Sequence, residues 1–342
     1  MSGKKVLSLF LYSGLLLVIV GLLPQSSEAG MRLKLATATK GGTYYPVGVA
    51  LAELINEKLS SSSTGITVEA ITSAGSFENI ELLERNASQL AILESLIGAL
   101  AWRGMEKYLG RPMRGIRSIT TLWEDVVHLL VRSEKAKTGN VMDLLQFGKD
   151  GFSMGKEGSG TRISTEIILT NLQIYPEDVF TVVDLGYKDS SLSLQKGKIS
   201  GMSTPGGLPV NAVTEAFSKI GAKNLRILDF TKDQTDYINC PLRVWHPYVI
   251  PANTYPGQTR AVNSVAQPNF LGVRQNVDDD VVYLLTKTIF ENLPSLKKAH
   301  KAVSSMDLKK ALQSLQVPLH PGALKYYKEQ GVEIPSHLFP DF

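Results

Sequence analysis

The chain has 342 residues, a single cysteine and a formal net charge of +4, and 43% of its residues are hydrophobic. The weak, evenly spread positive charge argues against nucleic acid or an acidic membrane surface as a partner, and one cysteine excludes an intrachain disulfide. Because the length exceeds that of a usual single core, we expect two domains held together by apolar packing alone.

The N-terminal segment has the three parts of a secretory signal. Residues 4–5 are basic, 6–23 are almost wholly apolar, and Pro24 precedes small residues at 27–29. This pattern predicts a signal peptide over 1–29 and export to the periplasm. An uncleaved N-terminal anchor that tethers the protein to the membrane is the alternative, because the apolar run is long for a signal. No cysteine follows the run, which excludes a lipid-anchored lipoprotein.

The segment after the signal alternates strand, small-residue turn and helix. We expect strands at 33–38, 66–71 and 90–93, and helices at 47–59, 76–86 and 95–103, with Ser76 as a helix N-cap. This order predicts a parallel sheet with helices on its faces.

Two long extended runs then indicate a crossing into a second domain. These runs are 116–122 and 126–132. Beyond them we expect strands at 152–154, 179–185, 199–203 and 225–230, and helices at 161–172, 192–196 and 210–220. Residues 248–272 are rich in Pro and Asn with short extended pieces, which suggests the return crossing. Helices are expected at 281–292, 295–303, 308–315 and 321–330.

Four small, donor-rich turns stand at helix N-termini. They are Gly41-Gly42-Thr43-Tyr44-Tyr45, Ser73-Ala74-Gly75-Ser76, Gly158-Ser159-Gly160-Thr161 and Thr204-Pro205-Gly206-Gly207. Such turns lie at the carboxyl edge of a parallel sheet, where ligands bind, and their free N–H groups attract anions. A single turn of this kind is ordinarily just a tight connection. Two in each half favour a shared carboxylate site.

Other chemistries have little support in the sequence. Gly155 to Thr161 fails the phosphate-binding-loop pattern, because no lysine directly precedes Thr161 and the glycine spacing is wrong. The five histidines show no metal-ligand spacing. Nothing local activates Cys240 as a nucleophile. Glu94 follows a buried-looking strand at its carboxyl end, so we expect it to face a cleft. We therefore expect no catalytic residue, no metal and no cofactor.

Several segments, in order along almost the whole chain after the signal, resemble one family. They are Gly41 to Gly48, Ser73 to Asn79, Gly158 to Thr161, Tyr255 to Gln258, Val282 to Lys287, Pro318 to Ala323 and Tyr326 to Gly331. Together they resemble the TAXI solute-binding proteins of TRAP transporters. The resemblance implies an α/β, two-lobed type II periplasmic-binding-protein fold, each lobe a sheet flanked by helices, with two crossover strands. Lobe 1 would comprise 31–125 and 270–342, and lobe 2 would comprise 126–269 with the crossover segments.

The resemblance also implies a function and a site. It implies a receptor that captures a small organic anion, an amino acid or a dicarboxylate, in an interlobe cleft and delivers it to a sodium-driven TRAP permease. We expect a monomer with no nucleic acid partner. The ligand-binding residues expected at matching positions are Gly42, Thr43, Tyr44, Tyr45, Ser73, Ser76, Asn79, Glu94, Ser95, Ser159, Gly160, Thr161, Thr204 and Gly206.

Two departures from the family pattern bear on the solute. Glu94-Ser95-Leu96 stands where the family has Gln-Ser-Asp, and an acid there would repel a carboxylate, pair with an ammonium or stay protonated. Leu122-Trp123-Glu124-Asp125 replaces Leu-Tyr-Pro-Glu, and the larger ring is expected to narrow the pocket. Two other functions remain open: a secreted enzyme on the same scaffold with Glu94 as general base, or a ligand-sensing partner of a membrane signalling protein.

Overall fold

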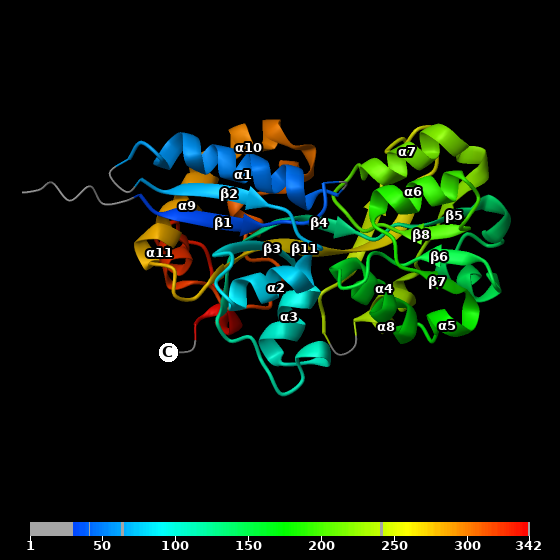
Figure 1. Ribbon diagram of the computed structural model, residues 1–342, viewed down its shortest axis with the longest axis horizontal. Helices are drawn as coiled ribbons and strands as arrows, with labels where there is room; N and C mark the ends of the chain where they lie inside the picture. Colours follow the sequence, from blue (N-terminus) through cyan, green and yellow to red (C-terminus); the bar gives the residue numbers. More distant parts are fainter. Residues whose placement is uncertain (1–29, 41, 63–64, 240–241, 341–342) are drawn as a thin grey trace, which may run out of the picture.

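Two lobes, each built on one sheet with helices on its faces, lie end to end (Figure 1). The computed structural model describes residues 30–40, 42–62, 65–239 and 242–340. The predicted signal at 1–29 and Cys240 lie outside these described residues. Within them, no helix combines the length and apolar character needed to cross a membrane.

The first sheet takes strands from both ends of the chain. Its order is β10-β11-β3-β1-β2, and β4 pairs with the other side of β11. The strands are β1 (Arg32–Ala36), β2 (Thr67–Ile71), β3 (Leu90–Glu94), β4 (Ile116–Val126), β10 (His246–Ile250) and β11 (Val262–Arg274). The helices of this lobe are α1 (Tyr44–Leu59), α2 (Ser76–Glu84), α3 (Ser95–Arg103), α9 (Asp279–Glu291), α10 (Leu293–Ala299) and α11 (Pro321–Glu329). Helices α1 and α10 lie on one face, and α2 and α3 on the other (Figure 1).

The second sheet has the order β7-β6-β8-β5-β9. Its strands are β5 (Leu129–Arg132), β6 (Gly151–Ser153), β7 (Thr181–Val183), β8 (Gly201–Ser203) and β9 (Leu225–Ile227). Its helices are α4 (Gly160–Asn171), α5 (Pro176–Val179), α6 (Tyr187–Gln195), α7 (Asn211–Ile220) and α8 (Lys232–Ile238). Helices α6 and α7 cover one face, and α4, α5 and α8 the other (Figure 1).

Short 3-10 helices complete the described elements. They are η1 (Glu106–Tyr108), η2 (Ser133–Lys135), η3 (Val141–Gln146), η4 (Ala222–Asn224), η5 (Lys301–Ser305), η6 (Leu308–Lys310) and η7 (Ser336–Leu338). The helix expected at 308–315 is therefore wrong beyond its first turn. Strand β4 takes the carbonyls that a helix would need, because the Thr121 N–H donates to Ala311 O at 2.8 Å and the Thr121 hydroxyl donates to Lys310 O at 3.0 Å.

Both sheets are mixed: the first three strands pair parallel as expected, and the later strands of the sheet add antiparallel pairs. Strand β1 runs parallel to β2 and β3, and β6 runs parallel to β7 and β8. The antiparallel strands are the crossing ones: β11 pairs antiparallel with β3 and β4, and β5 with β8 and β9. The physical reason is topological, since β4 leaves the first lobe and β11 returns beside it.

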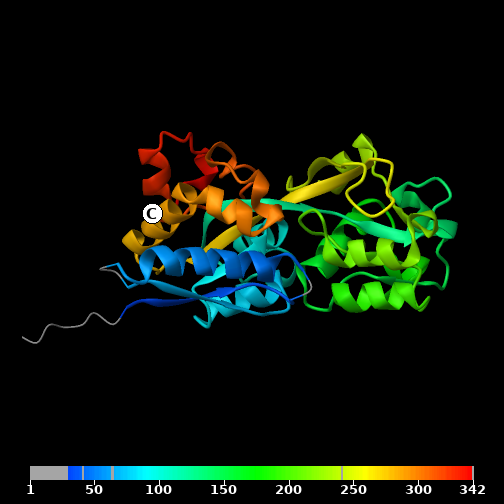
Figure 2. The ribbon, with the colours of Figure 1, turned by 90° about the horizontal axis from the view of Figure 1, so that it is seen from above.

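The two crossover strands join the lobes side by side. Strand β4 ends at Val126 and β5 begins at Leu129. Between them, the Val127 N–H donates to Val265 O of β11 at 2.9 Å. Strand β11 is one continuous strand of 13 residues, not the short pieces expected in 248–272. Figure 2 shows it running from one lobe towards the other. The hydrogen-bonded pair of strands therefore links the two lobes.

Candidate functional site

A cavity of about 60 Å³ lies between the lobes. Its walls come from the segments after β1 and β2 and the last residue of β3 in the first lobe, from the segments after β6, β7 and β8 in the second, and from the crossover strand β4. Apart from β4, these are the carboxyl ends of the parallel strands. In this conformation the space holds roughly four to six water-sized groups. The lining residues are Ala38, Thr39, Gly42, Thr43, Tyr44, Ala74, Gly75, Ser76, Glu94, Asp125, Lys156, Ser159, Gly160, Thr161, Gly186, Tyr187, Pro205 and Gly206.

All four sequence-predicted turns reach this cavity. The predicted site residues that line it are Gly42, Thr43, Tyr44, Ser76, Glu94, Ser159, Gly160, Thr161 and Gly206. The predicted site residues outside its lining are Tyr45, Ser73, Asn79, Ser95 and Thr204. Ser76 is the first residue of α2 and not its N-cap, because Gly75 takes that position with φ of 121°. The Ser76 hydroxyl instead accepts a hydrogen bond from the Glu94 backbone N–H at 3.1 Å.

Asn79 and Ser73 lie beneath the cavity and connect its walls. The fully buried Asn79 amide donates to the carbonyl oxygens of Thr37 at 2.7 Å and Ile92 at 2.8 Å. Its oxygen accepts from the Ser73 hydroxyl at 2.6 Å. These bonds tie the carboxyl ends of β1 and β3 to α2. Both side chains therefore support the turns that line the cavity.

This placement of Asn79 predicts the effect of removing it. Asn79→Ala removes the amide that donates to the buried carbonyl oxygens of Thr37 and Ile92, so we expect a loss of about 2 kcal/mol in the free energy of unfolding. Urea unfolding measures this value. A ligand shell role would instead show as weaker binding with little change in stability, and that result would contradict the placement.

The structure adds cavity residues that sequence reasoning missed. Asp125 lies in the segment 122–125, in which only the ring of Trp123 was expected to affect the pocket. Lys156 lies in the segment 155–161, which does not match a phosphate-binding loop. Tyr187 was not among the expected ligand-binding residues, because α6 begins at Tyr187, earlier than the helix expected at 192–196. Gly186, at the carboxyl side of a predicted strand, is the signal that could have placed that helix start at the cleft.

Glu94 bridges the two lobes. Its Oε2 accepts hydrogen bonds from Ser164 Oγ of α4 at 2.5 Å and from Gln267 Nε2 of β11 at 3.1 Å. A β-carbon added at Gly160 would lie 2.3 Å from Glu94 Oε1, so the carboxyl packs directly on the first turn of α4. A side chain of the first lobe therefore occupies part of the helix N-terminus at which the sequence predicted a bound anion.

Burial dominates the electrostatics of the cavity. It raises the pKa of Glu94 to about 7, against the opposing effect of the hydrogen bonds from Ser164 and Gln267. Burial, and then the charge of Glu94, raises the pKa of Asp125 well above its usual range, while the Asn269 side chain acts in the opposite direction. No cationic side chain of the described residues forms an ion pair with either carboxyl.

Two tyrosine hydroxyls are fixed on opposite walls. Tyr44 OH donates to Asn269 Oδ1 at 2.5 Å and lies 3.2 Å from Ser76 Oγ. Tyr187 OH donates to the carbonyl oxygen of Pro205 and lies 3.0 Å from Thr161 Oγ1. Burial raises the pKa of both phenols, so both stay neutral hydroxyls.

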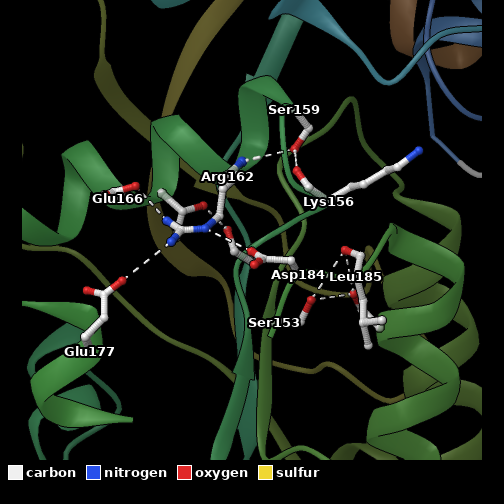
Figure 3. Close-up of polar contacts among 11 residues, drawn as sticks. Ser153, Lys156, Ser159, Arg162, Glu166, Glu177, Asp184 and Leu185 are labelled. Carbon is white, nitrogen blue, oxygen red and sulfur yellow. Dashed lines mark hydrogen bonds and ion pairs between the residues drawn. The ribbon is translucent and has the colours of Figure 1, made fainter. Parts of the chain in front are cut away.

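The first turn of α4 is capped, and its arginine is turned away from the cavity. Ser159 Oγ accepts from the Arg162 N–H at 3.2 Å. The Arg162 guanidinium points towards three acidic side chains of the second lobe (Figure 3). Its nitrogens lie 2.7 Å from Glu166, 2.9 Å from Asp184 and 3.6 Å from Glu177. Among the described residues that line the cavity, Lys156 alone carries a positive charge.

Comparison with known proteins places the chain in a family. Residues 35–331 match the family model described as the NMT1-like family. The chain belongs to the NMT1-like family. In the described part of this NMT1-like protein, no group of three or more His, Cys, Asp or Glu side chains is placed to hold a metal ion.

Solved structures share the fold of this NMT1-like protein. MatC from Rhodopseudomonas palustris with bound malate is 13% identical, with 88% of this chain and 97% of that chain covered and a TM-score of 0.54. The periplasmic binding protein BugD is also 13% identical, with 88% of this chain and 94% of that chain covered and a TM-score of 0.51. These likenesses and the two-sheet architecture confirm the expected two-lobed periplasmic-binding-protein fold.

Proposed function

We propose that this NMT1-like protein is an extracytoplasmic solute receptor of the TAXI type. It captures a small organic anion, an amino acid or a dicarboxylate, between its lobes and delivers it to a TRAP permease. The observation that carries the proposal is the cavity walled by strand ends of both sheets. The signal pattern at 1–29 supports the periplasmic location, and the malate bound to MatC supports a small-carboxylate ligand.

Closure follows from the geometry of the cavity. Lobe 1 comprises 31–125 and 270–342, and lobe 2 comprises 126–269. A ligand that contacts both lobes does so only when they are together, so its binding free energy shifts the population towards the closed form. Bending of β4 and β11 is the motion that permits opening. The closed form presents the surface that the permease recognises.

The ligand shell contains the predicted residues that line the cavity, joined by Asp125, Lys156 and Tyr187. The N-terminal turns of α1 and α2 supply N–H groups, whereas Glu94 covers part of the α4 N-terminus. Each exposed helix end contributes about 0.3–1 kcal/mol towards an anion. Affinity of about 1 μM corresponds to roughly −8 kcal/mol, so most of the binding free energy comes from hydrogen bonds of the hydroxyl and N–H groups and from apolar contacts with the cavity wall.

An enzyme is the second candidate, because Glu94 has a pKa of about 7 and lines the cavity. A pKa near neutral is suited to a general base. Ser164 and Gln267, however, hold the Glu94 carboxyl against α4. Mass spectrometry of ligand incubated with the protein separates the two functions, since a receptor returns the ligand unchanged.

Isothermal titration with a panel of amino acids and dicarboxylates tests the proposal. We expect at least one compound to bind at about micromolar affinity and to make the protein more compact in small-angle scattering. Thr161→Ala, at the first turn of α4, should weaken that binding by about tenfold. The control Glu53→Gln, on the exposed side of α1, should leave it unchanged. Absence of binding across the panel by folded protein would reject the receptor function.

A further inference from the structure

The cavity is lined by two acidic side chains and one basic side chain among the described residues. Glu94 and Asp125 both line the cavity, and both are buried, each residue with 4% of its surface exposed to solvent. Both carboxyls line the same cavity, and the charge of Glu94 adds to burial in raising the pKa of Asp125. A buried carboxylate without a cation is unfavourable, so structures normally pair or protonate it. Here the described residues supply no cationic partner to either.

The nearest basic side chains do not remove this imbalance. Arg162, at the start of α4, is engaged by Glu166, Asp184 and Glu177 on the far side of the helix (Figure 3). Lys156 is exposed at the edge of the cavity and has no ion-pair partner among the described residues. The cavity therefore has an acidic inner wall and one basic group at its edge.

The hydrogen-bonding capacity of the wall is likewise unbalanced. Glu94 receives its hydrogen bonds from Ser164 and Gln267 at Oε2 alone, and Oε1 faces Gly160. The nearby Tyr44 and Tyr187 hydroxyls already donate, to Asn269 and Pro205. The inner wall thus presents acceptors that call for a donor from the ligand, and an ammonium group donates three hydrogen bonds.

We infer that the solute carries a protonated amino group, which binds between Glu94 and Asp125 as their missing cation. This inference rests on the proposed receptor function and narrows its ligand class. It excludes simple dicarboxylates, which would bring a further negative charge against the two acids. Any carboxylate of the solute lies towards Lys156, the exposed basic residue of the cavity lining.

Binding of an ammonium group should change the protonation of Glu94. The titratable and charged groups around Glu94 are Asp125 of β4, Tyr44 of α1, Tyr187 of α6 and Lys156 before α4. Glu124, whose carboxylate lies 3.3 Å from His246 Nε2, acts on Asp125. With a Glu94 pKa of about 7 in the free protein, an ammonium ligand releases a proton on binding near neutral pH. Affinity should then rise about tenfold from pH 6 to pH 8.

Titration calorimetry with matched ligands, in buffers of different ionisation enthalpy, tests the inference. The probes are L-glutamate against glutarate, and L-alanine against propionate and propylamine. We expect binding by the amine-bearing members only, with net proton release at pH 7. Binding of L-alanine or L-glutamate alone assigns a role to the carboxylate, and binding of propylamine shows that the amine suffices. Both results support the inference.

Other outcomes overturn one claim or both. Binding of glutarate or propionate in preference to the amines, with proton uptake, rejects the amine site and leaves the receptor function standing. Failure of every probe, and of the wider panel of solutes, to bind the folded protein rejects the receptor function and the inference with it.

Substitutions locate the effect at the two acids. Glu94→Gln should weaken amine binding on the order of 100-fold and flatten its pH dependence. Asp125→Asn should also weaken it while leaving the contacts of Glu94 with Ser164 and Gln267 in place. The control Glu53→Gln makes the same charge change on the surface and should alter neither affinity nor proton release. Unchanged amine affinity in both cavity variants would exclude the acids as the amine site.

Discussion

Alanine at position 160 is expected to abolish ligand binding, with a loss of affinity of at least about 100-fold. The added β-carbon would lie 2.3 Å from Glu94 Oε1 and 2.8 Å from Glu94 Cδ. Glu94 cannot withdraw easily, because Ser164 and Gln267 hold its other oxygen. The strain is relieved either by breaking the hydrogen bonds of Glu94 with Ser164 and Gln267 or by moving α4 away from β3, and both changes disrupt the contact between the two lobes. Calorimetry measures the lost affinity, and small-angle scattering measures the opening.

Two further variants make this prediction specific. Gly115→Ala places a methyl group where no atom lies within 4 Å, so it serves as the matched control. The double variant Gly160→Ala with Glu94→Ala removes the clashing carboxyl and should restore the compact shape, although not amine binding. Because the two residues touch, their effects on compactness should be strongly non-additive. A compact Gly160→Ala protein with normal affinity would show that α4 and β3 do not meet as described.

Stability should fall with rising pH through the titration of Glu94. Burial raises the pKa of this carboxyl from 4.5 to about 7 on folding. Well below pH 4.5 the carboxyl is protonated in both the folded and the unfolded state, so it does not change the free energy of unfolding. As the pH rises towards 7, the unfolded state releases the proton first, so the free energy of unfolding falls by up to about 3 kcal/mol. The loss is complete once the pH passes the folded-state pKa.

Urea unfolding of the wild type and Glu94→Gln at pH 5 and pH 8 measures this loss. The wild type should lose more stability than the variant between the two pH values, and the difference isolates Glu94 from the other acids. Asp125 contributes in the same direction, since burial also raises its pKa. Glu53→Gln should follow the wild type. Parallel curves for wild type and Glu94→Gln would mean that Glu94 is not held in a desolvated site.

Local patterns were sufficient to predict the first three strand–turn–helix units. The expected strands at 66–71 and 90–93 match β2 and β3, and the helix at 95–103 matches α3. The spacing of apolar residues and the residue types of turns depend only on residues close together in the sequence, so both can be recognised in the sequence directly. The position of Glu94 at the cavity was predicted by the same reasoning, because a residue that ends a parallel strand lies at the edge of the sheet where ligands bind.

Features that depend on distant partners were not predictable in this way. Asp125 reaches the cavity only because β4 pairs with β11, more than a hundred residues later in the chain. The occupation of the α4 N-terminus by Glu94 depends on how the two lobes meet. The helix expected at 308–315 fails because β4 takes its carbonyls. Each of these outcomes was decided by tertiary contacts that override local preference.

The position of β11 has a consequence for the order of folding during synthesis. The second sheet uses only strands from β5 to β9, so all of its strands have been made when Ile227 has emerged, and the last helix of its lobe, α8, ends at Ile238. The first sheet needs β11, which separates β3 from β4 and ends at Arg274. A nascent chain stopped before Val262 would hold β4 as an unpaired edge. The middle of this protein is thus expected to acquire structure before the beginning does, and protease protection of stalled chains should appear in that order.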